Sequence, residues 1–332
     1  MFKKILLVLV ALVLIAIVIG LLLPSKVVVE RSVVINRPAS MVFATVNSFQ
    51  LFHKWSPWQD LDPNMHQNTD GPRDGVGAKL VWSGNDKVGS GSDTITAFDL
   101  NRSVDTDIDF GKMGAAKSRM LMVADGNATK TTWRLTMDMG ANPIAHYFGL
   151  TMDRMIGPDF ANGLAKLKRL VEAMPDQDIA GLKVEPAELS SRPILLVSET
   201  TPPDGVSKGY LDAFTRIAKF MAKNKLKQTG APFGIEGATT ASSYGFDAGI
   251  PVDRSDSVGI GGVKVDKSYA GKTLKTVHLG PYKNLNATRD KLLAYAAAHG
   301  YARSGAIFFS FIDDPDKVPE PQVRTEVYAP VE

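Results

Sequence analysis

Two acidic residues, Asp247 and Glu326, stand at matching positions of two similar strand-like segments, DAGIPV and EVYAPV. Side chains alternate between the faces of a strand, so Glu326 and Tyr328 share one face while apolar residues occupy the other. If the apolar faces meet helices, the opposite faces carry both acids toward a shared groove. Tyr282, in the segment GPY, and Tyr244 are further candidates to line it. Acids beside aromatic rings would bind a cation by charge and by attraction to the ring faces. A solvated or Arg-paired Glu326 on an exposed sheet is the alternative.

Three aromatic residues in the first half of the chain, Trp82, Phe110 and Trp133, fall on predicted central strands. They are expected to line a cavity for an apolar ligand or to fill the core of their domain. Large apolar residues face the interior in either case, so spacing alone leaves both interpretations open. Trp55 and Trp58 are expected to pack at one end of the same sheet.

Other motifs that carry chemistry are weak. The five histidines are scattered without the spacing of a metal site, the chain has no cysteine, and no G-x-S-x-G segment is present. We therefore expect no metal, no cofactor and no catalytic constellation. Lys and Arg number 38 against 35 Asp and Glu, a net charge of +3, which argues against nucleic acid as a partner. Nothing in the sequence indicates an oligomeric state.

Ile5 to Leu23 is an uninterrupted run of 19 apolar residues. A helix of that length spans about 28 Å, close to the hydrocarbon thickness of a bilayer. We interpret residues 1–26 as a single transmembrane anchor, with a cleaved signal peptide as the alternative. Lys3 and Lys4 favour a cytoplasmic amino terminus, which places the rest of the chain outside the cytoplasm, at a cell (inner) membrane.

Residues 27–173 are predicted to form an antiparallel sheet closed by one long helix. Strand-like runs with turn-like separators lie between Leu80 and Met139, and MIGPDFANGLAKLKRLVEAM shows helical spacing of its apolar residues. Residues 174–191 contain two prolines and no sustained period, so they are predicted to be a linker.

Residues 192–332 repeat the order strand, helix, strand, strand. The segments beginning at Asp247 and Glu326 align at an offset of 79 residues. Two such units, each unable to bury its own sheet face, are expected to pair into one pseudo-symmetric domain.

The first domain resembles the SRPBCC superfamily, the helix-grip fold of START domains and polyketide cyclases, in FHKWSPW (52–58) and MIGPDFANGLAKLKRLVE (155–172). The second is similar to the GyrI-like effector-binding domain of bacterial multidrug-responsive regulators, in HLGPYKNL (278–285) and FIDDPDKVPEPQVRTEVYAPV (311–331). The latter resemblance implies a pocket for amphipathic, often cationic, small molecules, with Glu326 facing the ligand. The chain departs from those regulators because it has no DNA-binding helix-turn-helix and carries the apolar amino-terminal segment.

Together these observations predict an α+β chain: a transmembrane helix, a helix-grip domain and a duplicated β-α-β-β domain. The expected function is extracytoplasmic binding of hydrophobic or amphipathic small molecules by two modules in tandem. One alternative is a hydrolase or cyclase of small electrophilic or polyketide-like compounds, with Glu326 as general base. The other is an envelope scaffold that binds no ligand.

Overall fold

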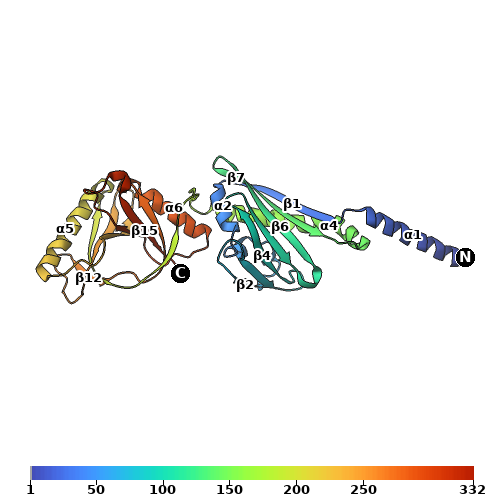
Figure 1. Cartoon of the computed structure of the whole chain (residues 1–332), viewed down its shortest axis with the longest axis horizontal. Helices are drawn as coiled ribbons and strands as arrows, with labels where there is room; N and C mark the ends of the chain where they lie inside the picture. Colours follow the sequence, from blue (N-terminus) through green and yellow to red (C-terminus); the bar gives the residue numbers. More distant parts are fainter. Residues whose placement is uncertain (1) are drawn as a thin grey trace. The chain divides into compact units, whose positions relative to one another are not determined.

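The computed structural model describes residues 2–332, apart from the side chain of Met113. It contains two compact units, one of residues 1–180 with 298–300 and one of residues 181–297 with 301–332 (Figure 1). Each unit has its own antiparallel sheet and its own helices, so the predicted α+β fold class is confirmed.

The chain begins with helix α1 (Phe2–Leu22), which is long and apolar enough to cross a membrane. Nearly all its side chains are exposed, as expected for a helix that meets lipid rather than a protein core. Gly20 is the exception, because it lies against Pro143 at the start of helix α4. The Tyr147 hydroxyl donates to the carbonyl of Ala16 at 2.7 Å, which ties the end of α1 to α4.

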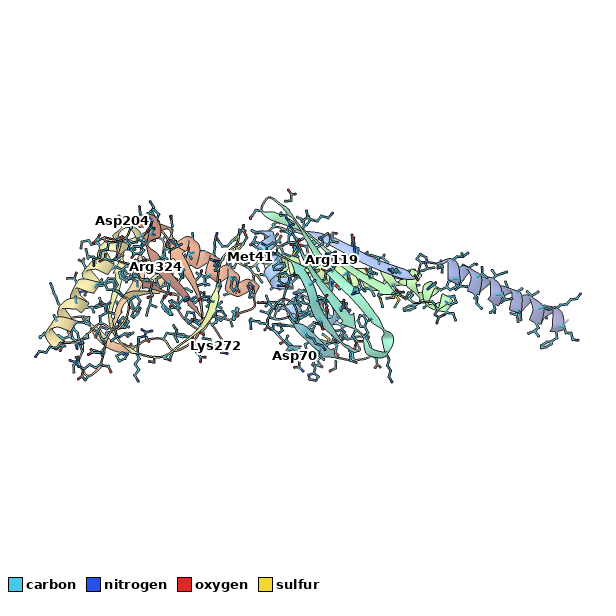
Figure 2. The ribbon with its side chains drawn as sticks, viewed as in Figure 1. Met41, Asp70, Arg119, Asp204, Lys272 and Arg324 are labelled. Atoms are coloured by element: carbon cyan, nitrogen blue, oxygen red, sulfur yellow. The ribbon has the colours of Figure 1, made fainter. Side chains whose placement is uncertain are left out.

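Seven strands of the first unit form one sheet in the order β1-β7-β6-β5-β4-β3-β2. They are β1 (Lys26–Ile35), β2 (His66–Asp70), β3 (Lys79–Ser83), β4 (Ser90–Asp99), β5 (Ser103–Asp109), β6 (Ala115–Asp125) and β7 (Ala128–Asp138). Short helices are α2 (Ala39–Val46), α3 (Phe52–Trp55), η1 (Trp58–Asp60) and η2 (Gly111–Met113). Met41 of α2 is buried, whereas Arg119 of β6 is exposed and pairs with Asp105 at 3.0 Å. Figure 2 labels both residues.

The long helix α4 (Pro143–Glu172) packs along β1 (Figure 1). The side chains of three α4 residues are buried against the sheet, as the helical spacing predicted: Phe160, Leu164 and Leu167. The helix begins twelve residues before the segment read from the sequence. Asn142 caps it by accepting from the Ile144 N–H at 3.0 Å, and Pro143 occupies the first turn, where its missing N–H costs nothing.

The eight-stranded sheet of the second unit has the order β12-β9-β11-β10-β14-β15-β13-β8. Its strands are β8 (Glu185–Leu189), β9 (Pro193–Thr201), β10 (Phe233–Thr239), β11 (Tyr244–Pro251), β12 (Lys264–Lys267), β13 (Gly271–Leu279), β14 (Phe308–Phe311) and β15 (Arg324–Pro330). Its helices are η3 (Pro203–Gly205), α5 (Val206–Asn224), η4 (Tyr282–Asn284), α6 (Leu285–Ala298) and η5 (Glu320–Gln322). The first repeat, β9-α5-β10-β11, meets the second, β13-α6-β14-β15, at the β10–β14 pair, so the predicted duplication is present.

Each repeat buries one face of its strands. Phe246, Ala248 and Ile250 of β11 pack with Ile217 of α5, and Val327 and Ala329 of β15 pack in the corresponding core of the second repeat. The alternation of side chains in the sequence therefore predicted correctly which residues of β11 and β15 face the helices and which face away from them.

The stretch predicted to be a linker, 174–191, differs from that prediction at both ends. Met174 and Ile179 are buried, and residues 185–189 form the edge strand β8 beside β13. Pro186 favoured a linker because proline usually interrupts a strand. An edge strand tolerates proline, however, because one of its sides needs no ladder hydrogen bonds.

Candidate functional site

A pocket of about 350 Å³ lies on the face of the second sheet opposite its helices. One row of facing residues crosses this sheet from strand to strand: Asp247, Ile235, Phe308, Tyr328 and Lys275. The first four of them line the pocket. The row joins the two repeats, so the pocket is a property of the whole domain rather than of either half.

The rings of Phe308 and Tyr328 form a stacked platform in this pocket, with centroids 4.7 Å apart and planes within 6°. Burial raises the pKa of Tyr328, and its hydrogen bond to Glu326 raises it further. The phenol therefore stays neutral at any ordinary pH and acts as a donor.

Glu326 already has partners within the protein. The Tyr328 hydroxyl donates to its Oε2 at 2.6 Å, and Lys275 Nζ lies 3.5 Å from its Oε1. Lys275 also pairs with Glu185 at 3.3 Å, which raises the pKa of Lys275, with Glu326 adding to the effect. Glu326 does not line the pocket of about 350 Å³, although it shares the face of Tyr328. A role as general base would require these contacts to break first.

Asp247 is the acid that faces the pocket without a partner. No hydrogen bond or ion pair to its carboxylate exists within residues 2–332. The reason is the difference between the repeats at the offset of 79 residues. Gly249 occupies the position that corresponds to Tyr328 in the second repeat. Gly249 pairs across the ladder with Leu196, whereas Tyr328 pairs with Lys275. The donor and the cation that hold Glu326 are therefore missing around Asp247.

Other charges at this pocket are Arg192, Asp266 and Lys267, all exposed. The lining thus holds two acids and two bases. Exposed charges are well screened by water, so the half-buried Asp247 has the strongest influence on a ligand seated on the Phe308–Tyr328 platform.

Tyr282 and Tyr244 lie away from this pocket. Tyr282, in η4, meets the ring of Phe311 edge-on at 5.4 Å. Tyr244 packs against Phe246 on the face that α5 covers, and burial raises its pKa. Their roles in ligand binding remain predictions.

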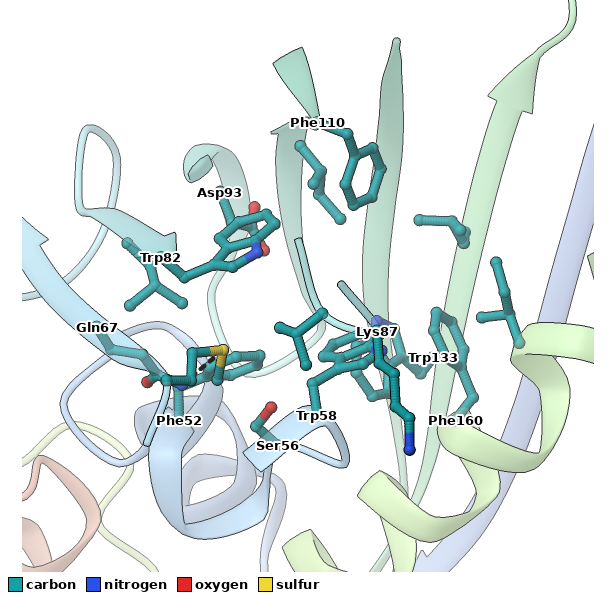
Figure 3. A pocket seen from close by; sticks show the side chains of 16 residues that line it. Phe52, Ser56, Trp58, Gln67, Trp82, Lys87, Asp93, Phe110, Trp133 and Phe160 are labelled. Atoms are coloured by element: carbon teal, nitrogen blue, oxygen red, sulfur yellow. Dashed lines mark hydrogen bonds between the residues drawn. The ribbon is translucent and has the colours of Figure 1, made fainter. Parts of the chain in front are cut away.

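A second cavity, of about 210 Å³, lies in the first domain between the sheet and the helices (Figure 3). Trp82, Phe110 and Trp133 all line it, so the structure gathers the three aromatic candidates around one space. Trp82 meets Phe110 edge-on at 6.0 Å. Trp133 stacks on Phe160 at 4.0 Å and donates from its indole N–H to the Ser118 hydroxyl at 3.0 Å, which fixes its ring. Binding of a ligand by these three residues remains a prediction.

Trp55 and Trp58 form part of the same aromatic cluster, since both rings lie edge-on to Trp133, at 5.4 and 5.7 Å. Trp55 is buried, whereas Trp58 also lines the cavity. Packing and lining are therefore combined at this end of the sheet.

Asp93 on β4 also lines this cavity, although it was not among the residues predicted from the sequence. Burial raises the pKa of Asp93 to about 7, against the smaller opposing influence of the Thr106 hydroxyl and the Thr94 N–H. A signal was present in SDTITAF, because Asp93 shares strand parity with the fully buried Ile95. An inward-facing acid on a half-buried strand is unusual enough to mark a candidate site.

Within the part of the chain that the structure describes, no group of three or more histidine or acidic side chains is placed to hold a metal ion.

Two cavities in two independent domains define a tandem of small-molecule-binding modules. Residues 26–172 match the family described as polyketide cyclase/dehydrase and lipid transport, and residues 183–332 match the GyrI-like small molecule binding domain. The chain is thus an SRPBCC domain followed by a GyrI-like domain, and both resemblances read from the sequence are confirmed.

Several solved structures match part of the chain. EcmrR in its DNA complex is 16% identical with a TM-score of 0.42, covering 57% of this chain and 72% of its own. An uncharacterized conserved protein from Listeria innocua is 15% identical with a TM-score of 0.37, covering 45% and 92%. Ara h 8.0201 is 12% identical with a TM-score of 0.32, covering 43% and 97%. No curated protein matches the chain.

Proposed function

We propose that this protein is a membrane-anchored, extracytoplasmic binding protein for hydrophobic or amphipathic small molecules, and that its GyrI-like domain takes a cationic ligand at Asp247. The observation that carries this proposal is the unpartnered Asp247 carboxylate in a pocket floored by the Phe308–Tyr328 platform. A carboxylate supplies charge, and an aromatic face attracts a cation while excluding water from the apolar part of the ligand.

The size of the pocket supports a small-molecule ligand. Its volume of about 350 Å³ falls within the range of about 300–1,000 Å³ typical of small-molecule sites. The presence of a cavity in each domain supports a binding role over the alternative of a scaffold.

The anchor is supported by α1, whose apolar side chains are exposed over nearly its whole length. Exposing such a surface to water would be strongly unfavourable, whereas lipid accepts it. Lys3 and Lys4 before the span favour a cytoplasmic amino terminus, and both domains then lie on the far side.

The binding proposal can be tested with the full chain in lipid nanodiscs, using phenyltrimethylammonium and its uncharged counterpart of the same shape, tert-butylbenzene. Equilibrium dialysis against empty nanodiscs corrects for partition into lipid. We expect the cation to bind better, and Asp247→Asn to weaken its binding at least tenfold, which corresponds to about 1.4 kcal/mol.

Asp266→Asn is the matched control, because Asp266 lines the same pocket but is exposed on β12. Glu326→Gln should have a smaller effect than Asp247→Asn, since Lys275 and Tyr328 already hold Glu326. Equal binding of the two probes, or an Asp247→Asn variant that keeps its affinity for the cation, would refute a cation site at Asp247.

A further inference from the structure

The cavity of the SRPBCC domain is lined mainly by apolar side chains, and its polar lining residues are Ser56, Gln67, Lys87 and Asp93. Among the described residues that line it, Lys87 and Asp93 are the only charged ones, and most of the others are aromatic or aliphatic. Lys87 is exposed, whereas the Oδ1 atom of Asp93 is buried. Figure 3 shows the Asp93 carboxyl group among the lining side chains, beside Trp82.

The protein satisfies the Asp93 carboxyl group only in part, since the Thr106 hydroxyl and the Thr94 N–H favour its ionised form while its Oδ1 atom stays without a partner. Its Oδ1 accepts no hydrogen bond, and no ion pair joins Asp93 to Lys87 or to any other cation within residues 2–332. A buried polar atom without a partner destabilises the folded protein, and a charged group does so more strongly. An acid kept for stability would be paired, as Asp105 and Asp107 are with Arg119 and Lys117 on the outer face of the same sheet.

The indole of Trp82 can lie beside this acid because Gly91 has no side chain to occupy the same space. Gly91 and Asp93 share one face of β4, and Trp82 faces Gly91 across the β3–β4 ladder. A Cβ at Gly91 would lie 2.6 Å from Cζ2 of Trp82, so the ring occupies the space that a side chain would fill. Phe110 then meets Trp82 edge-on at 6.0 Å and closes the aromatic surround.

From this geometry we infer that the SRPBCC cavity binds a small hydrophobic amine, with the ammonium group at Asp93 and Trp82 and the apolar part against Trp133 and Phe160. A cation supplies the missing donors to Oδ1 and gains from the face of the indole. The cavity of about 210 Å³ lies below the range of about 300–1,000 Å³ typical of drug-sized ligands, so the ligand is small. This inference extends the proposed function, which concerns the other domain, to a second site with its own ligand class.

The shifted pKa of Asp93 fits this role. Burial holds it near 7 in the empty cavity, and an ammonium group beside it would favour the ionised form and lower the pKa again. Amine binding should therefore weaken below pH 7 as Asp93 takes up a proton.

Tryptophan fluorescence reports on this site alone. All four tryptophans, Trp55, Trp58, Trp82 and Trp133, lie in the first domain, and three of them line the cavity. A failure of the Asp247 site in the second domain is therefore distinguishable from a failure of this one.

The test uses the full chain in nanodiscs and three probes with the same tail: n-octylamine, 1-octanol and sodium octanoate. We expect the amine to bind at least tenfold more tightly than octanoate, and Asp93→Asn, of nearly the same shape, to remove most of that preference. Asp86→Asn, an exposed acid in the β3–β4 connection, is the matched control and should leave the preference unchanged.

The inference is overturned if wild-type protein binds octanoate or octanol as tightly as the amine, if none of the probes changes the fluorescence, or if Asp93→Asn keeps the preference for the amine. Should that variant fail to fold, the wild-type pH dependence decides. Between pH 8 and pH 5.5 the affinity for octylamine should fall several-fold while that for octanol stays constant. An equal response of both probes contradicts the assignment. Lys87 is the other charged group of the described lining, no described histidine lines the cavity, and Asp107 on the neighbouring strand pairs with Lys117 at 3.1 Å.

Discussion

The hydroxyl of Tyr328 donates a 2.6 Å hydrogen bond to Oε2 of Glu326, two residues earlier on the same face of β15. The glutamate that the sequence singled out is therefore held by its own strand and by Lys275 on the next one. Its counterpart in the first repeat, Asp247, has Gly249 and Leu196 at the corresponding positions and is left open to the pocket. The two repeats share a backbone plan but use their acids differently.

Lys275→Leu gives the second repeat the residue that the first repeat has at Leu196. With its cation removed, Glu326 adds uncompensated negative charge next to the pocket, so the affinity for phenyltrimethylammonium should rise about three- to tenfold, or about 0.6–1.4 kcal/mol. Lys272→Leu, which removes an exposed lysine from the same strand, is the control and should change the affinity little. Dialysis with the two probes measures both, and an unchanged or lower affinity in Lys275→Leu would contradict the neutralising role of Lys275.

Asp93 should make the stability of the first domain depend on pH. Its pKa is about 7 in the folded domain and lower in the unfolded chain, so its ionisation opposes folding. The contribution of Asp93 to the free energy of unfolding is fully present below the pKa of Asp93 in the unfolded chain. It is lost as the pH rises to about 7, the pKa in the folded domain. Relative to Asp93→Asn, the wild-type domain should lose about 2–3 kcal/mol of unfolding free energy between pH 5 and pH 8.

Urea unfolding followed by tryptophan fluorescence measures this difference, because it reports on the first domain only. Parallel pH dependences in wild-type protein and Asp93→Asn would show that the carboxyl group is solvated in the folded state.

Gly91→Ala should destabilise the first domain and displace Trp82. The added Cβ would lie 2.4 Å from the carbonyl oxygen of Asp109 and 2.6 Å from the indole, so either the strand pair or the ring must move. Overpacking of this kind costs about 1–3 kcal/mol. Urea unfolding gives the cost, and the response of the fluorescence to octylamine should shrink. Ser90→Ala, at the exposed neighbouring position, should alter neither quantity.

The topology of the chain can be tested cleanly because it contains no cysteine. Ser242→Cys, at an exposed position of the second domain, introduces a single thiol. A membrane-impermeant maleimide should label it in intact spheroplasts if this domain lies outside the cytoplasm. Labelling only after lysis would reverse the proposed orientation, and release of a shortened chain into the soluble fraction would identify the apolar segment as a cleaved signal.

Features that depend on local pattern could be predicted before the fold was known. The period of two in DAGIPV and EVYAPV assigned the faces of Asp247, Glu326 and Tyr328, because successive strand side chains point to opposite sides whatever the neighbouring strands are. The repeat order predicted the pairing of two β-α-β-β units, and the apolar run predicted α1. The linker prediction was wrong at β8 because the sequence does not show that Pro186 lies in an edge strand, which depends on the order of the strands in the sheet.

Which acids lack a partner could not be predicted in the same way. Whether a carboxylate is neutralised depends on residues brought beside it by strand register, and Lys275 is 51 positions from Glu326 in the chain. Likewise, Asp93 is a strand residue like many others until β3 and β5 place Trp82 and Ile108 around it and leave its Oδ1 without a donor. Burial and pairing are properties of the packed neighbourhood, and desolvation of a charge is felt only once that neighbourhood has formed.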